Sequence, residues 1–222
     1  MVAPSKADIR ATYERIAVSF AATRREPWPE VRSFIDRLPP ESVVLDVGCG
    51  NGRHTKTLAA GGHSVVAVDF SRDLLTIGRH DVAKSGVHTR VAWVEADATT
   101  LPVHSDSFDA CVCVALLHHL PDREARIAAL EEIGRILRPD SPVLLSVWAR
   151  DQKRFEAVPP VHPGANGDVI VPWTMPDGTS VPRFYHLFRE GELERMIIEA
   201  GLHGERFFRG AGNWFGLARK HG

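Results

Sequence analysis

Residues 43–71, VVLDVGCGNGRHTKTLAAGGHSVVAVDFS, form the stretch of sequence that decides the expected fold. An apolar run leads into a glycine-rich turn, a helical segment comes next, and a second apolar run ends at Asp69. Strand, glycine turn, helix and strand in this order are typical of a βαβ unit that holds a nucleotide at its turn.

The rest of the chain continues this alternation. Apolar runs predict strands near residues 43–47, 65–69, 91–95, 110–114 and 143–148. Helices are expected over residues 6–21 and after Asp122, where apolar residues recur at three- and four-residue spacing until Pro139 blocks continuation. This rhythm favours an α/β fold with a mainly parallel sheet and helices on both faces.

One domain is expected over residues 1–222. We expect an N-terminal helix and lid over 1–41, a nucleotide-binding core over 42–148, an irregular insertion over 149–189, and a closing helix and hairpin over 190–222. The insertion is expected because residues 149–181 are rich in Pro and Gly, and long loops above the carboxyl ends of strands are usually functional.

Composition limits the class of protein. The chain has 222 residues, 44% of them hydrophobic, and a formal net charge of -1, as expected for a compact domain with a substantial core. It has no apolar run of membrane-spanning length, and its N-terminus lacks a signal's apolar core, which predicts a cytoplasmic location. Cys49, Cys111 and Cys113 lack the paired spacing of a zinc site, so we expect packing groups and no metal.

The spacing of the glycines separates two candidate ligands, a dinucleotide and S-adenosylmethionine (SAM). Gly48, Gly50 and Gly52 form G-x-G-x-G, whereas the dinucleotide fingerprint is G-x-G-x-x-G. The carboxylate of Asp46 would repel a phosphate and attract an ammonium group. Asp69 is placed to accept hydrogen bonds from ribose hydroxyls and Asp97 from an adenine amino group, so three acids at three strand ends favour SAM.

Five segments resemble the class I SAM-dependent methyltransferases: LDVGCGNGRH (45–54), VAVDFS (66–71), EADATTLP (95–102), FDACVCVALLHHL (108–120) and LRPDSPVLLSVWA (137–149). The resemblance implies a Rossmann-like, seven-stranded, mainly parallel sheet with the last strand antiparallel. It also implies that the SAM-binding residues are Tyr13, Asp46, Gly48, Cys49, Gly50, Asn51, Asp69, Phe70, Ser71, Asp97, Ala98 and Val114.

The methyl acceptor has to be inferred from the residues just after the fourth strand. They contain no Asn/Asp-Pro-Pro-Tyr motif, which disfavours methylation of a nucleobase amine, and Cys111 and Cys113 lie within the strand, which disfavours carbon methylation through a cysteine nucleophile. His118 and His119 would lie near the transferable methyl, where an imidazole can orient an anionic oxygen.

YERIAVSFAATRREPWPEV (13–31), VPWTMPDGTSVPRFYHLFREGEL (171–193) and GNWFGLARK (212–220) resemble one subfamily. It esterifies 5-carboxymethyluridine at the wobble position of transfer RNA (tRNA), giving 5-methoxycarbonylmethyluridine. The resemblance implies that the acceptor pocket is lined by Arg24, His118, His119, Trp148, Arg183, Tyr185 and His186. Because a carboxylate is already ionised at neutral pH, no general base is needed.

Two kinds of partner are expected. Relatives of this subfamily bind a small zinc-ribbon activator on a sheet edge, which implies a heterodimer through the strand that contains Val91 and Trp93. Arg150, Lys153 and Arg154 could meet tRNA phosphates. A small-molecule O- or C-methyltransferase and a non-catalytic SAM-binding regulator remain alternative interpretations.

Overall fold

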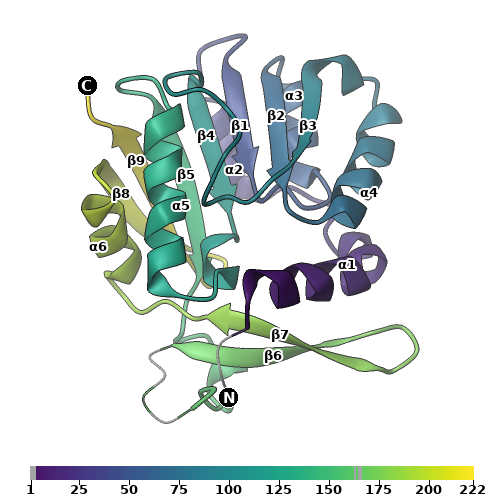
Figure 1. Ribbon diagram of the computed structural model, residues 1–222. Coiled ribbons are helices and arrows are strands. Elements are labelled where there is room, and N and C mark those ends of the chain that lie inside the picture. Colours follow the sequence, from purple (N-terminus) through teal and green to yellow (C-terminus); the bar gives the residue numbers. More distant parts are fainter. Residues whose placement is uncertain (1–3, 163, 165–166) are drawn as a thin grey trace.

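The computed structural model describes residues 4–162, 164 and 167–222, so parts of the expected lid (residues 1–3) and insertion (163, 165 and 166) lie outside the described residues. A seven-stranded sheet has the strand order β3-β2-β1-β4-β5-β9-β8 (Figure 1). Its strands are β1 (Val43–Val47), β2 (Ser64–Asp69), β3 (Val91–Glu95), β4 (Ala110–Val114), β5 (Pro142–Trp148), β8 (Leu202–Gly210) and β9 (Asn213–Lys220). Only β9 runs antiparallel to its neighbours β5 and β8, which confirms the expected topology.

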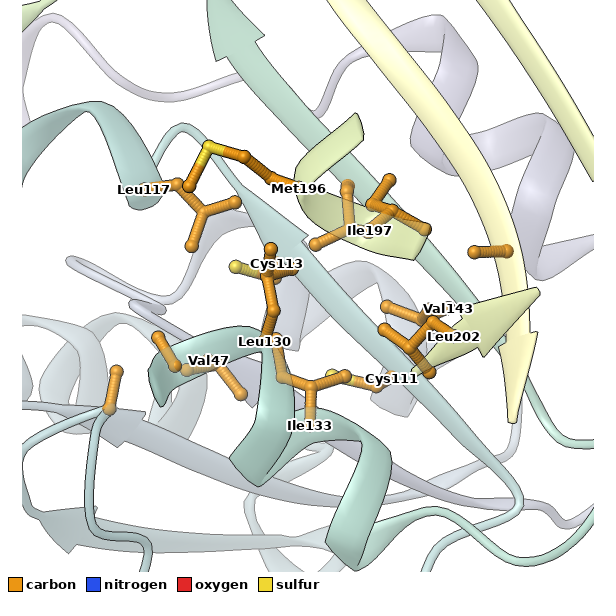
Figure 2. Close-up of a cluster of buried hydrophobic side chains, with 14 of the residues drawn as sticks. Val47, Cys111, Cys113, Leu117, Leu130, Ile133, Val143, Met196, Ile197 and Leu202 are labelled. Atoms are coloured by element: carbon orange, nitrogen blue, oxygen red, sulfur yellow. The ribbon is translucent and has the colours of Figure 1, made fainter. Parts of the chain in front are cut away.

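Helices cover both faces of the sheet, and the central strands β1, β4 and β5 are therefore buried on both sides. On one face, α2 (Pro29–Ile35) and α3 (Arg53–Ala60) pack against the sheet through Phe34 and Leu58. On the other, α5 (Arg123–Ile136) and α6 (Glu192–Glu199) cover the sheet, on the near side in Figure 1. Figure 2 shows this core, where Leu130 and Ile133 of α5 and Ile197 of α6 surround Cys111 and Cys113.

The strands that follow β1 in the chain are added on one side of it (β2, then β3), and the next strands are added on the other side (β4, then β5). The order of the sheet therefore switches between β1 and β4, which are parallel neighbours. In open α/β sheets the ligand crevice lies beyond the carboxyl ends of the strands at such a switch point. A 3-10 turn, Leu117–His119, comes after β4 at this end, and α4 (Arg72–Ala83) begins just after β2.

The segment expected to be irregular contains a regular hairpin. Strands β6 (Asp168–Thr174) and β7 (Ser180–His186) pair as a separate two-stranded antiparallel sheet, after a 3-10 turn at Lys153–Phe155. Its Gly and Pro residues mislead because Pro176 and Gly178 lie in the connecting turn, whereas Pro172 and Pro182 face each other within the ladder. Figure 1 shows α1 (Lys6–Ala22) and then this hairpin lying across one end of the main sheet.

β3 lies at the edge of the sheet, as predicted. A 3-10 turn, His88–Arg90, precedes it. The indole of Trp93 turns inward from this strand: a Cβ added at Gly52 or Gly78 would lie 2.6 or 2.7 Å from it. Arg79 donates a hydrogen bond to the Trp93 carbonyl over 3.2 Å. Across the described residues, no helix combines the length and the apolar character that crossing a membrane requires.

Candidate active site

The glycine turn after β1 forms the floor of the candidate site. Gly48, Gly50 and Gly52 all have positive φ angles of 69, 56 and 73°. A side chain at Gly48 would meet Leu116 at 2.9 Å, so this glycine is also needed for packing. At Gly50 an added Cβ would meet nothing within 4 Å. The open space above Gly50 is therefore available to a ligand that approaches the backbone closely.

Asp69 connects the end of β2 to this turn. Its Oδ2 accepts a hydrogen bond from the Gly50 N–H over 2.8 Å, and its Oδ1 accepts one from the Ser71 N–H over 2.9 Å. Burial raises the pKa of Asp69 to about 6, against the opposing effect of these backbone hydrogen bonds. Each carboxylate oxygen still has a second lone pair with which to accept a ribose hydroxyl.

A cavity extends from Asp69 toward α1. Asp97 lies on its wall and forms an ion pair with Lys6 of α1, with 2.7 Å between Oδ2 and Nζ. Among the predicted cofactor-binding residues, this cavity is lined by Tyr13, Gly48, Gly50, Asp69, Phe70, Asp97 and Ala98. We call it the acidic cavity because Asp69 and Asp97 lie on its wall.

Asp46 and Ser71 do not reach the wall of this cavity. The Asp46 carboxylate turns toward α3, where it accepts a hydrogen bond from Thr55 Oγ1 over 2.6 Å, and burial raises its pKa to about 6. Ser71 is fully buried and caps α4 by accepting a hydrogen bond from the Leu74 N–H. Both side chains therefore stabilise the elements around the site.

A second cavity shares Phe20, Gly48, Gly50, Ala115 and His119 with the first. The remaining predicted cofactor-binding residues, Cys49, Asn51 and Val114, line this second cavity. It is also lined by Arg24, Arg53 and Arg154, and by no acidic residue among those described. We call it the basic cavity.

One wall of the basic cavity is a stack of rings. Trp148, at the end of β5, stacks on Tyr185 of β7 with 4.3 Å between centroids and 10° between planes. His118 also stacks on Tyr185, with 5.3 Å between centroids and 21° between planes. The Arg154 guanidinium lies 4.2 Å from the Trp148 centroid. These contacts bring the loop after β4, the end of β5 and the hairpin together.

The tautomer of His118 is set by its contacts. The backbone N–H of Trp148 donates to Nδ1 over 3.1 Å, so a neutral imidazole carries its proton on Nε2. Burial and the neighbouring His119 lower the pKa of His118 well below its ordinary value, which keeps it neutral. Nε2 has no hydrogen-bond partner among the described residues. His118 thus offers one unpaired N–H donor.

His119 lies between the two cavities and lines both. The Tyr13 hydroxyl of α1 lies 3.0 Å from its Nδ1. Burial, together with the charge of Arg183, lowers the pKa of His119 to about 3. At neutral pH this imidazole is uncharged, and it is too weak a base to hold a proton.

The two arginines predicted to line the acceptor pocket, Arg24 and Arg183, differ in how they meet the basic cavity. Arg24 lines the basic cavity, with its guanidinium 4.8 Å from the Phe20 centroid, and burial lowers its pKa. Arg183 is buried behind the ring stack, where it donates to the Tyr185 hydroxyl over 2.6 Å. Arg183 therefore acts on the cavity through Tyr185.

His186 lies outside both cavities, contrary to the expectation that it lines the acceptor pocket. Consecutive strand residues point to opposite faces, so His186 faces away from Tyr185. Its Nδ1 lies 2.6 Å from Asp168 and its Nε2 2.6 Å from Glu192. Burial opposes protonation, but the two carboxylates outweigh it and raise the pKa of His186.

Several residues that line the cavities could not be predicted from the glycine and acid motifs. Lys6 and Phe20 reach the cavities only because α1 folds over the strand ends, and Asn213 only because β9 begins beside β5. Arg53 and His54 come directly after the glycine turn, and this adjacency was a signal available in the sequence. Arg150 is engaged elsewhere, donating to the carbonyls of Phe155 and Val158.

Comparison with known proteins agrees with this geometry. A family model described as "Methyltransferase domain" matches residues 44–140. A tRNA (carboxymethyluridine(34)-5-O)-methyltransferase from Xenopus tropicalis is 29% identical over 96% of this chain, which spans 40% of that relative's length. The protein of the same name from Schizosaccharomyces pombe is 28% identical, with 96% of both chains covered.

Solved structures show the same fold. A SAM-dependent methyltransferase from Methanosarcina mazei matches with a TM-score of 0.74 and 21% identity, over 88% of this chain and 99% of that one. With the strand order, the glycine turn and the matched domain, these likenesses confirm the resemblance inferred from the sequence and the use of SAM as cofactor. Residues 44–140 of the chain thus match a methyltransferase domain, and the chain has the fold of the SAM-dependent methyltransferases.

Proposed function

We propose that this protein transfers the methyl group of SAM to the carboxylate of 5-carboxymethyluridine at the wobble position of tRNA, forming a methyl ester. One observation carries the proposal: the two adjoining cavities differ in the charge of their linings. Asp69 and Asp97 line the acidic cavity with Lys6 as the counter-charge of Asp97, whereas the basic cavity has three arginines and no acid among its described lining residues. The first suits a cofactor with hydroxyl, amino and sulfonium groups, and the second suits an anionic acceptor.

The cofactor would occupy the acidic cavity and extend over Gly50 toward the basic one. Asp69 would accept hydrogen bonds from the ribose, and Asp97 and Ala98 would contact the adenine. Gly48, Gly50 and Asn51 would surround the methionine part, with Tyr13, Phe70 and Val114 closing the sides. The expected N-terminal lid fits this arrangement, because Lys6 of α1 reaches across to Asp97.

The protonation states support an ionised acceptor. The imidazoles of His118 and His119 are neutral at physiological pH, and the lowered pKa of His119, about 3, makes it unsuited to remove a proton. A carboxylate needs no base, so the protein's task is to hold the oxygen in line with the methyl carbon and sulfur. His118 would donate its Nε2–H to that oxygen, and Arg24 would neutralise the charge. Trp148 and Tyr185 would pack against the uracil.

Two finer assignments accompany the proposal. The protein would act on tRNA in the cytoplasm, and a zinc-ribbon activator would add a strand beside β3 to give a heterodimer. The edge position of β3 supports such pairing because edge strands carry unpaired backbone groups. Co-purification of the two proteins tests the heterodimer.

The test of the reaction uses SAM with a labelled methyl group and tRNA that carries 5-carboxymethyluridine. The expected product loses its label in mild alkali, because esters hydrolyse under conditions where nitrogen- and carbon-bound methyl groups persist. His118→Phe keeps the ring packing and removes the N–H donor, so turnover should fall at least tenfold while SAM affinity stays within twofold. Alkali-stable label, or transfer only to a small metabolite, would reject the proposal.

A further inference from the structure

A second group of side chains lines the basic cavity and has no role in holding the carboxylate. It consists of Trp28, Arg53 and His54, which we call the Trp28 cluster. The Arg53 guanidinium lies 5.0 Å from the Trp28 centroid, and the His54 ring lies 6.2 Å from it on an edge-to-face path. Trp28 itself is held by Phe215 of β9, at 5.7 Å. The cluster is therefore fixed in place by packing.

His54 lacks the hydrogen bonds that a buried imidazole requires. Its side chain is only 5% exposed, and neither ring nitrogen has a hydrogen-bond partner among the described residues. Leaving such a group unsatisfied costs about 1–3 kcal/mol, and native structures rarely accept that cost without a functional reason. Because His54 lines the basic cavity, a ligand there can supply the missing partner.

Arg53 has no ion-pair partner among the described residues, although the charge of the buried Asp46 opposes in part the effects that lower its pKa. In the described part of the chain its guanidinium forms neither a hydrogen bond nor an ion pair, although it stacks on Trp28. Burial and the nearby Arg24 lower the pKa of Arg53 to about 10, so it still carries a full charge at neutral pH. Arg24 and Arg154 line the same cavity, and a single substrate carboxylate can neutralise only part of this charge.

The basic surface continues out of the cavity. An outer groove shares Arg24, Asn51 and Arg53 with the basic cavity. It is also lined by Arg25, Lys56 and Lys84 and by two acids, Glu26 and Asp81. Both lysines are exposed. Basic side chains thus outnumber acidic ones by five to two in the groove that leads out of the candidate active site, as expected along the path of a polyanion.

We propose that the Trp28 cluster binds a backbone phosphate of the acceptor RNA, with Arg53 and the N–H of His54 as donors, and that the strand leaves over Lys56 and Lys84. This inference rests on the proposed function, because it takes RNA as the acceptor. A nucleic acid supplies one anionic phosphate per nucleotide, which matches the excess of cations over the single carboxylate. Arg forms two parallel hydrogen bonds to a phosphate, which a point charge cannot do.

The experiment measures binding of an anticodon stem-loop RNA, by fluorescence anisotropy, at a series of salt concentrations. Arg53→Gln should weaken RNA binding at least tenfold at low salt and reduce the slope of log affinity against log salt by about 0.7–1, the value for one lost phosphate contact. Arg37→Gln, at an exposed arginine that lines neither cavity nor the outer groove, is the matched control and should leave the slope unchanged. His54→Phe should weaken RNA binding without changing the slope.

A second measurement separates the possible anions. In calorimetry with SAM alone, the SAM affinity of the Arg53→Gln variant should lie within twofold of that of the original protein. A tenfold loss of SAM affinity would instead assign Arg53 to the cofactor's carboxylate and overturn the inference. The inference would also be overturned if the Arg53→Gln variant kept the salt slope of the original protein and still methylated RNA. In that case the proposed function stands. If the slope falls as expected but no alkali-labile ester forms, the phosphate site stands and the proposed function fails.

Discussion

Replacing Asp69 by Asn tests the cofactor site most directly, because each carboxylate oxygen already has one fixed partner. Oδ1 and Oδ2 accept backbone N–H groups from Ser71 and Gly50 over 2.9 and 2.8 Å. An Asn side chain has one oxygen and one NH2 group, so in either orientation a donor faces a donor. The same NH2 group also cannot accept a ribose hydroxyl.

The expected loss can be worked out from these contacts. A hydrogen bond to a charged acceptor contributes about 1.5–3 kcal/mol, and a buried unpaired N–H costs about 1–3 kcal/mol. Losing roughly 2 kcal/mol of the binding free energy lowers the affinity for SAM about 30-fold. The unpaired N–H also destabilises the glycine turn itself, so the free energy of unfolding should fall by about 1–3 kcal/mol even without ligand.

Isothermal calorimetry measures the first quantity and denaturant unfolding the second. Asp97→Asn is the matched control: its ion pair with Lys6 is partly exposed, with 35% of the Asp97 side chain accessible, so the loss of SAM affinity should stay below about fivefold. Because the pKa of free Asp69 is raised to about 6, SAM affinity should also fall about tenfold between pH 7 and pH 5 in the original protein, and not in Asp69→Asn. Unchanged SAM affinity in Asp69→Asn would refute the assignment.

Three further predictions concern the surrounding structure. The pKa of His186 is raised above 6.5 in the folded protein. Its contribution to the free energy of unfolding is therefore complete below pH 6.5 and disappears as the pH rises through the folded pKa, and denaturant unfolding of His186→Gln at a series of pH values should not show this decrease. Gly78→Ala places a Cβ 2.7 Å from an indole carbon and should cost about 1–3 kcal/mol in thermal unfolding, whereas Gly134→Ala, with its nearest atom at 3.6 Å, should cost nothing. Tyr185→Phe removes the acceptor of a buried guanidinium and should lower stability by about 1–3 kcal/mol; a wild-type midpoint would contradict the buried contact.

The sequence determined the main sheet and its cofactor because these depend on local patterns. Apolar runs, the G-x-G-x-G spacing and the acids at strand ends act over a few residues, and the apolar runs placed β1, β2 and β4 correctly. The edge position of β3 was expected from the fold's known strand order, and the structure confirms it.

Only the tertiary structure decided where individual polar side chains point. Asp46 bonds to Thr55, and His186 bonds to Asp168 and Glu192, because burial requires each polar group to find a partner among neighbours that are distant in sequence. The hairpin of β6 and β7 was also hidden, since its pairing depends on cross-strand contacts and not on composition. The basic cavity exists only once α1, α3, β5 and β9 have packed together, because its arginines come from separate segments that packing alone brings to one wall.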